Sequence, residues 1–381
     1  MVKFLLRSAF VMFFLCNNSF ANNDLLKQQD DETSSEIRFD GRIMADSQHI
    51  IKGKTSNTQN AAAIRRAWLG FGGNIGKNWD YRGLFGFEND EAEIIDSFIA
   101  YKGFKDSEIL IGNFFENNGL DANTPNLVNP LMERSAAFST FRKLRRAGAS
   151  YNYYQQDYAV KFGVFGPSIN KTKLEDRGEG VSGRAYYLPI NDMENGHYLH
   201  VGFNASYRTP ESINNTLRYK SSGNSWVIDE NIINSGVMRN VNNHQHYSPE
   251  VRYQNGAFSA TAEYFKTIIN RNSSDLSFDS SYVLMSYFLT GQQYEYGFKN
   301  GAPIDVINKE GAIEVATRYS NVDMNNKDVR GGKLNSYDLG VNYYPKDNLK
   351  FMLNYTYNKL KESPMTNKNP QHIMMRAQLW F

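Results

Sequence analysis

The stretch IMMRAQLWF, residues 373–381, alternates apolar and polar side chains up to the last residue of the chain. Its odd positions carry Ile373, Met375, Ala377, Leu379 and Phe381. Strict alternation predicts a β-strand with two different faces. In a soluble protein the apolar face needs a covering layer, whereas a strand that faces lipid needs none. The C-terminus therefore favours a strand in a membrane, with Phe381 closing a barrel at its periplasmic rim.

The N-terminal residues 1–21 have the pattern of a secretory signal peptide. Lys3 and Arg7 precede the apolar run SAFVMFFLC, and Ser19 and Ala21 are small residues at the cleavage-site spacing. The apolar run is far shorter than the roughly 20 residues that span a membrane as a helix. Removal of this leader also removes Cys16, the only cysteine, and leaves equal numbers of basic and acidic residues. Residues 22–35 are expected to form a flexible polar lead.

The composition fits a barrel better than a set of soluble domains. Tyr and Phe are abundant, at 24 and 25 residues, although the mean hydropathy is negative. Transmembrane β-strands combine these properties because each strand alternates an apolar with a polar face. In LNSYDLGVNYY, residues 334–344, one face carries Tyr and aliphatic side chains and the other carries Ser, Asp, Gly and Asn. Such a polar face suits a water-filled lumen.

Similar alternation recurs along the chain and predicts an all-β, antiparallel transmembrane barrel of about sixteen strands. A single domain, residues 36–381, accounts for the barrel. The strands are expected near residues 36–45, 62–73, 79–88, 93–103, 107–115, 145–154, 158–167, 179–188, 197–208, 247–254, 258–268, 279–290, 312–320, 334–344, 349–359 and 371–381. Short turns then lie on the periplasmic side and long loops outside, except that residues 291–311 form a long periplasmic turn, which either dangles or folds into the lumen.

Several stretches, taken in order, resemble the phosphate-selective O and P porin family. They are FDGRIMADS (39–47), IRRAWLGFGGNIGKNWDYRGLFGFEN (64–89), EIIDSFIAYKG (93–103), ILIGNFFE (109–116), PLMERSAAFSTF (130–141), RRAGASYNY (145–153) and SYFLTG (286–291). The resemblance implies a sixteen-stranded, homotrimeric channel in the outer membrane of a Gram-negative bacterium. It also implies an inward-folded constriction loop and a lumen whose arginines and lysines pass phosphate or polyphosphate.

The lumen is expected to have a weak preference for anions, because inward basic side chains slightly outnumber inward acids. Arg65 and Arg66 are adjacent, so a regular strand would aim one of them at lipid, at a cost of about 2–4 kcal/mol near the midplane. We therefore expect the pair at a β-bulge or near the interface, and the family resemblance favours a place for both along the lumen over an interfacial pair. The resemblance places Asp96 near the binding site, where it could orient an arginine or act as one charge of a network.

Residues 116–143 are the expected constriction loop, and basic residues gather near its end. The candidate channel-lining or anion-binding residues are Arg65, Arg66, Asp96, Glu133, Arg134, Arg142, Lys143, Arg145 and Arg146. The selective channels of the family carry several lysines along this loop, whereas here Lys143 is its only lysine. This departure favours general passage of small anions or other small hydrophilic solutes over phosphate specificity.

Two other classes of function are alternatives to a passive channel. A barrel hydrolase needs Ser, His and Asp or Asn together at one rim, and no nucleophile motif stands out. His244 and His246 could bind a metal, but they are expected in a long polar loop, so no metal, cofactor or catalysis is predicted. A plugged outer-membrane anchor or adhesin is the remaining alternative, because residues 116–143 and 209–245 could fill the lumen. No nucleic-acid signature is present.

Overall fold

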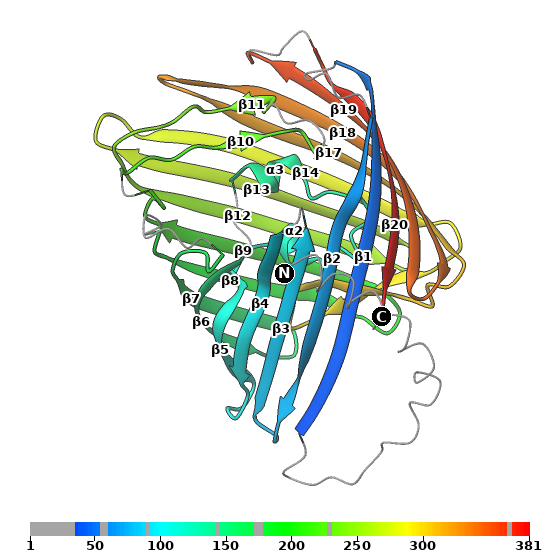
Figure 1. Cartoon of the computed structure of the whole chain (residues 1–381). Helices are drawn as coiled ribbons and strands as arrows, with labels where there is room; N and C mark the ends of the chain where they lie inside the picture. The colour runs from blue at the N-terminus through cyan, green and yellow to red at the C-terminus, as the bar shows by residue number, and fades with distance from the viewer. Residues whose placement is uncertain are drawn as a thin grey trace.

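Sixteen antiparallel strands form a closed barrel, as the alternating sequence predicts (Figure 1). The computed structural model describes residues 35–53, 60–88, 91–141, 145–170, 178–212, 214–226, 231–363 and 368–381, so the expected leader and most of the polar lead lie outside the described residues. The barrel strands, in order, are β1 (Ser35–Lys52), β2 (Asn60–Ile75), β3 (Trp79–Glu88), β4 (Glu91–Tyr101), β5 (Ser107–Phe115), β6 (Arg145–Tyr154), β7 (Tyr158–Phe165), β8 (Gly180–Asp192), β9 (His197–Arg208), β12 (Val241–Asn255), β13 (Phe258–Arg271), β14 (Leu276–Phe288), β17 (Ala312–Asn326), β18 (Val329–Lys346), β19 (Leu349–Lys361) and β20 (Gln371–Trp380).

The first and last strands form the seam of the barrel, where blue β1 runs beside red β20 (Figure 1). The pairing runs from Arg42 opposite Trp380 to Lys52 opposite Gln371. Gly41 and Phe381 then exchange two backbone hydrogen bonds, each 3.1 Å long. This closure leaves no unpaired sheet edge, which lipid could not satisfy.

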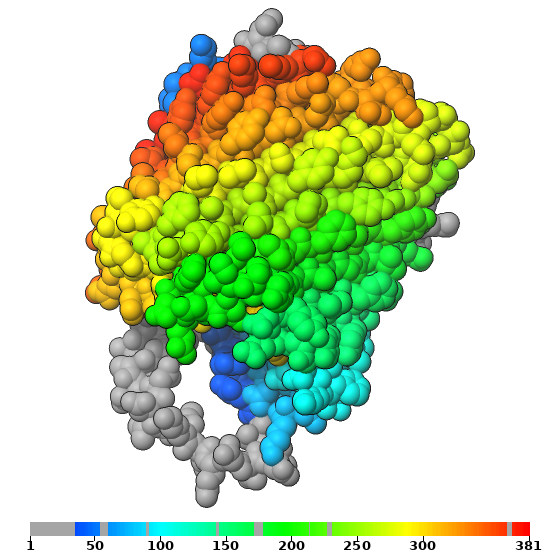
Figure 2. All heavy atoms as spheres, turned by 180° about the vertical axis from the view of Figure 1, so that it is seen from behind, coloured from blue at the N-terminus to red at the C-terminus, as the bar shows by residue number. Residues whose placement is uncertain are grey.

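Burial alternates along the strands in the sense opposite to that of a soluble protein. On β18, Tyr337, Leu339, Val341 and Tyr343 are exposed on the outer face. Ser336, Asp338 and Asn342 between them are buried inside the barrel. These exposed apolar side chains suit contact with lipid. Figure 2 shows the outer wall of the barrel from behind.

The connections are short at one end of the barrel and mostly long at the other, as expected for a periplasmic and an extracellular end. Residues 76–78, 155–157, 256–257 and 347–348 are examples of the short turns. The expected strands 312–320 and 334–344 imply a long extracellular loop between them, and this prediction is wrong. There β17 and β18 continue past the membrane and join through Lys327 and Asp328, with Lys327 in the left-handed region at φ 49°.

Three segments fold inside the barrel. The loop between β5 and β6 carries the short helices α2 (Leu120–Asn123) and α3 (Ala136–Phe141), and a small sheet pairs β10 (Lys220–Ser221) with β11 (Ile233–Asn234) (Figure 1). The third segment is the hairpin of β15 (Gln293–Gly297) and β16 (Ala302–Ile307). No helix in the described part of the chain is long and apolar enough to cross a membrane.

A buried apolar cluster closes much of the extracellular half of the lumen. Two inward-folded segments pack against inward apolar residues near the ends of the strands. They contribute Phe141 of α3 and Tyr219, Ile232 and Ile233 of the β9–β12 loop. The strand residues of this extracellular apolar cluster are Ile50, Val241, Ile269, Leu276, Phe278, Val322, Met324, Val329, Leu334 and Leu360. Above the membrane the inner face is therefore apolar and covered, whereas at membrane depth it is polar.

We predict that deletion of Phe381 impairs insertion into the outer membrane, because it removes two hydrogen bonds from the seam. The amount of heat-modifiable barrel in outer-membrane fractions measures insertion. Phe381→Leu keeps the backbone bonds and should insert better than the deletion. Equal amounts of folded barrel with and without Phe381 would contradict this role.

Candidate channel and constriction

The loop of residues 116–141 crosses the lumen and is held by wall side chains that donate to its backbone carbonyls. Lys350 Nζ donates to the carbonyl of Asn129 at 3.0 Å, and Arg376 donates to that of Met132 at 2.9 Å. Further donors are Asn342 to Pro130, Arg318 to Glu133 and Gln378 to Leu127. These donors lie on β17, β18, β19 and β20, so the loop is fastened to the wall opposite its own strands.

Two acids of the wall fasten the other end of this loop. Glu263 accepts hydrogen bonds from the backbone N–H groups of Leu120 and Asp121 at 2.9 and 2.8 Å, and Glu250 accepts from Leu120 at 3.1 Å. Carboxylates are favourable partners for the free N–H groups that begin a helix, here α2. Both acids lie at inward positions of their alternating strands, but only the structure shows that they anchor the loop.

Glu133 joins the loop to three strands through arginines. Its carboxylate lies 3.2 Å from Nε of Arg65 and 3.3 Å from Nη2 of Arg376, which also forms two 2.7 Å bonds to Asp46. Burial disfavours the ionised form, but the charges of Arg65, Arg66 and Arg376 outweigh it and hold the pKa of Glu133 at about 2. The carboxylate therefore stays ionised and acts as a clamp between loop and wall.

Arg65 and Arg66 both face the lumen because the pairing of β1 with β2 shifts at this point. Met44 lies opposite Arg66, whereas Ala45 lies opposite Ile64, so Arg65 is the extra residue of a β-bulge. The predicted bulge is therefore present. Arg66 lies beside the ring of Trp68, with its guanidinium carbon 5.8 Å from the ring centroid.

Three arginines of the lumen wall lie against the ring of Trp68. The guanidinium carbons of Arg42 and Arg145 lie 4.8 and 5.6 Å from its ring centroid, in addition to that of Arg66. Its indole N–H donates to Glu88 at 2.6 Å. Cation–π contact lets the aromatic face hold like charges close together. Sequence reasoning missed Arg42 and Trp68, although both lie on inward positions of stretches that carry the family resemblance.

Asp96 holds Arg145 in a two-pronged ion pair, with distances of 2.7 and 3.3 Å. The guanidinium of Arg145 also lies 4.0 Å from the ring centroid of Phe115. Asp96 is thus paired with an arginine at the lumen wall.

The other basic candidates are not one cluster. Arg134 pairs with Asp121 within the loop at 3.5 Å, whereas Arg146 lies on the wall, paired with Glu211 and 4.0 Å from Glu116. Glu116 also pairs with Arg208. Arg142 and Lys143 lie outside the described residues. The closeness of these residues in the sequence predicts one basic patch. The structure separates them, because Arg134 belongs to the loop and Arg146 to β6.

The hairpin of β15 and β16 folds back into the lumen, which settles the placement of residues 291–311. Arg184 donates to the carbonyls of Asn300 and Gly301 at 2.8 and 2.7 Å and pairs with Glu250 at 2.7 Å. Gln254 donates to the carbonyl of Tyr294 at 2.8 Å. The hairpin therefore narrows the lumen from the periplasmic side.

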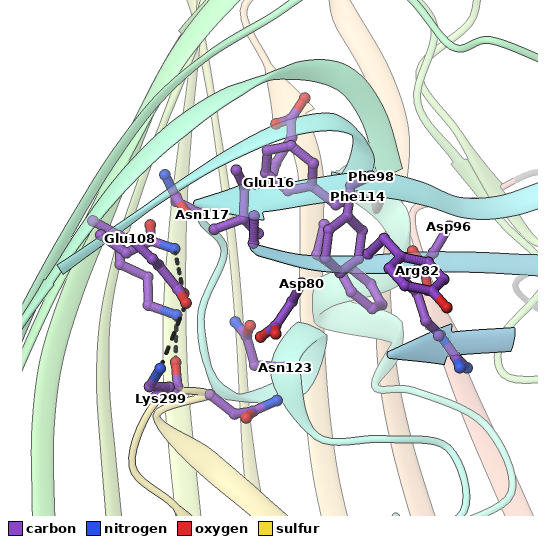
Figure 3. A pocket seen from close by; sticks show the side chains of 18 of the residues that line it. Asp80, Arg82, Asp96, Phe98, Glu108, Phe114, Glu116, Asn117, Asn123 and Lys299 are labelled. Carbon is purple, nitrogen blue, oxygen red and sulfur yellow. Dashed lines mark hydrogen bonds and ion pairs between the residues drawn. The ribbon is translucent and has the colours of Figure 1, made fainter. Parts of the chain in front are cut away.

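The described residues line two larger cavities in the lumen, one beside β1–β8 and the other beside β9 and β12. The periplasmic cavity has a volume of about 750 Å³, and Figure 3 shows Glu108 with Lys299 on one side of it and Arg82 and Asp96 on the other. Its charged lining comprises Arg38, Arg82, Lys161, Arg184, Lys299, Asp40, Asp80, Asp96, Glu108 and Glu116. The extracellular cavity has a volume of about 480 Å³ and is lined by Arg208, Arg218, Lys220, Glu116 and Glu211 among its charged residues.

His244 and His246 lie on β12, so their prediction as loop residues is wrong. Both are buried, and Nδ1 of His244 lies 3.2 Å from Nε2 of His246 and 3.1 Å from the hydroxyl of Tyr219. At these residues β12 extends beyond the apolar band. Its outward residues there are polar, so the sequence shows no alternation that would predict a strand. Among the described residues, no group of three or more His, Cys, Asp or Glu side chains is arranged to hold a metal.

The sequence profile of the family described as phosphate-selective porin O and P matches residues 37–381. This chain belongs to that family. The family and the barrel fold place the chain among the porins of the Gram-negative outer membrane. Both the family and the fold indicate a channel rather than an enzyme.

Two relatives and two solved structures illustrate the likeness. An uncharacterized protein of Caulobacter vibrioides is 26% identical over 310 residues, which cover 77% of this chain and 62% of that protein. Porin O of Pseudomonas aeruginosa is 27% identical over 382 residues, covering 88% of this chain and 86% of the relative. The anion-selective porin from Comamonas acidovorans superposes with a TM-score of 0.62 at 11% identity, covering 91% of this chain and all of that one. A trimer form of OmpT of Vibrio cholerae superposes with a TM-score of 0.60 at 10% identity, covering 91% of this chain and all of that one.

We predict that Glu133→Gln destabilises the barrel at neutral pH by about 2–4 kcal/mol, because it leaves buried arginines short of a carboxylate. The folded pKa of Glu133, about 2, lies below its ordinary value of 4.5, so its contribution is present above pH 4.5 and is lost as the pH falls toward 2. The difference in free energy of unfolding between wild type and variant should shrink over that window, as measured by urea titration of tryptophan fluorescence.

Glu310→Gln is the matched control, because Glu310 forms an exposed pair with Lys346 at the periplasmic rim. Its effect should stay below about 1 kcal/mol. If the difference in free energy of unfolding between wild type and Glu133→Gln does not change with pH, Glu133 does not act as an ionised clamp.

Proposed function

We propose that the chain is a passive channel for small hydrophilic solutes, with a weak preference for anions and with phosphate among the anions that pass. The observation that supports it is the pair of charged cavities that flank the constriction loop inside a closed barrel. Neither the family nor the fold requires a cofactor for passive diffusion. Like the solved trimer form of OmpT, the barrel is proposed to assemble as a homotrimer.

The balance of charge supports a weak rather than a strong preference. Five basic and five acidic residues line the periplasmic cavity, and three basic and two acidic residues line the extracellular cavity. Most lumen arginines are paired with a carboxylate, including Arg65, Arg145 and Arg184. Pairing cancels the field that would concentrate anions at a constriction. The excess of basic residues comes from the extracellular cavity, where Arg218 and Lys220 add to Arg208.

A plugged anchor is the second candidate, because the extracellular apolar cluster and the loop of residues 116–141 fill much of the lumen. The two candidates differ in one property, since a plugged barrel carries no current. An enzymatic role has no support from the site.

Reversal potential in planar bilayers across a KCl gradient tests the proposed function. We expect a reversal potential with the sign of a chloride-selective channel and a magnitude well below that of a channel that passes chloride alone. Low phosphate should not block the current. A current blocked by low phosphate would instead establish a specific site and point to Arg65, Arg66 and Arg134. A cation-selective current, or none from inserted barrels, would contradict the proposal.

We also predict that replacing residues 294–305 by a short turn raises the single-channel conductance, because it removes the hairpin from the lumen. Arg184 keeps Glu250 as a buried partner in this variant. A glycine inserted between residues 347 and 348, in a turn that stays at the rim, should leave the conductance unchanged. An unchanged conductance in the hairpin variant would show that the hairpin does not restrict the path.

A further inference from the structure

The two cavities meet at the start of the constriction loop. Glu116 and Asn118 line both the periplasmic and the extracellular cavity, which open toward opposite ends of the barrel. Both side chains are themselves buried, with exposed fractions of 5% and 1%. Within the described residues, these two positions therefore separate the two water-accessible spaces.

The opposite side of the loop offers far less room. The cavity between the loop and the wall near Arg252, Tyr282 and Arg318 has a volume of only about 20 Å³. On the extracellular side, that half of the lumen is covered by the extracellular apolar cluster. A solute path along β5–β9, past Glu116, is the one that both large cavities favour.

In the part of the chain that the structure describes, two arginines and two carboxylates surround this junction, and their charges cancel. The carboxylate of Glu116 bonds to Arg208 and lies 4.0 Å from Arg146, which in turn bonds to Glu211. The four groups come from different parts of the fold: Glu116 follows β5, Arg146 is the second residue of β6, Arg208 ends β9 and Glu211 follows it. All four side chains are at least four-fifths buried, so solvent screens their charges poorly.

We propose that Glu116 sets the ion selectivity of this channel by neutralising Arg146 and Arg208 where the two cavities meet. This inference rests on the proposed porin function and deepens it. With Glu116 ionised, two arginines face two carboxylates and the junction favours neither sign. Without that charge, Glu211 is the one carboxylate among the described residues that is left to the two arginines, and the excess positive charge at the junction attracts anions.

The test measures the anion-to-cation permeability ratio of wild type, Glu116→Gln and Glu310→Gln in planar bilayers. Glu116→Gln should raise the ratio roughly three- to tenfold, the scale expected for one unit charge removed a few ångströms from the ions in a partly water-filled constriction. Glu310→Gln makes the same change of net charge at the rim and should leave the ratio unchanged. Equal ratios in all three proteins would overturn the inference, whereas no current from wild type would overturn the proposed function.

A second measurement follows the path itself and does not depend on how Glu116→Gln folds. Ser139 of α3 is exposed and lines the extracellular cavity, so modification of Ser139→Cys by a bulky charged thiol reagent should reduce the current. Ser273→Cys, exposed in the turn between β13 and β14 and absent from the cavity lining, should react without changing the current. A modified Ser139→Cys channel with unchanged current would place the path elsewhere and overturn the inference.

Discussion

Lipid offers no hydrogen-bond partners to a polypeptide backbone, and the whole architecture follows from that constraint. Sixteen strands pair in order, and β1 pairs with β20, so that every barrel strand has two neighbours. Once the sheet is closed, the outer face must be apolar and the polar half of each strand must point inward. The charged residues of the chain then gather in a confined lumen, where they must find one another.

At membrane depth the interior is consequently held by ion pairs and charge-assisted hydrogen bonds, together with small apolar clusters between loop and wall such as Met132, Met352 and Met374. Arg376 illustrates this, since it is fully buried and bonded at once to Asp46, to Glu133 and to the carbonyl of Met132. Breaking a buried pair on one side typically costs about 3–5 kcal/mol, because the remaining charge is left without a partner. The same bonds that stabilise the constriction loop also neutralise the arginines, which links the rigidity of the lumen to its weak selectivity.

Much of the barrel could be predicted from the sequence because the period of two is a direct consequence of strand geometry. The strand ends fit best where the apolar band is crossed, as in β3 and β5. They fit poorly for β12 and for the β17–β18 hairpin, where the strands extend beyond lipid and their outward residues become polar. The bulge at Arg65 was also predictable, because an arginine facing lipid is costly.

The arrangement of charges within the lumen was much less predictable. Alternation shows that Glu250, Glu263 and Arg184 point inward, but their partners come from a loop and a hairpin whose paths carry no periodic signal. The clustering of Arg134 with Arg146, suggested by their closeness in the chain, fails because one belongs to the loop and the other to the wall. Glu116 carried no signal of its own, since its position between two cavities depends on the folded path of the loop of residues 116–141.

The central claim is that a fastened loop and a hairpin leave a narrow, charge-balanced path between two wider cavities. Polymer exclusion tests it most directly, by recording single-channel conductance with polyethylene glycols of increasing size added to either side. The account predicts that polymers small enough to enter a cavity lower the conductance from their own side, while none that fills a cavity passes through to the other. Free passage of polymers as large as those that cross wide general porins would contradict it.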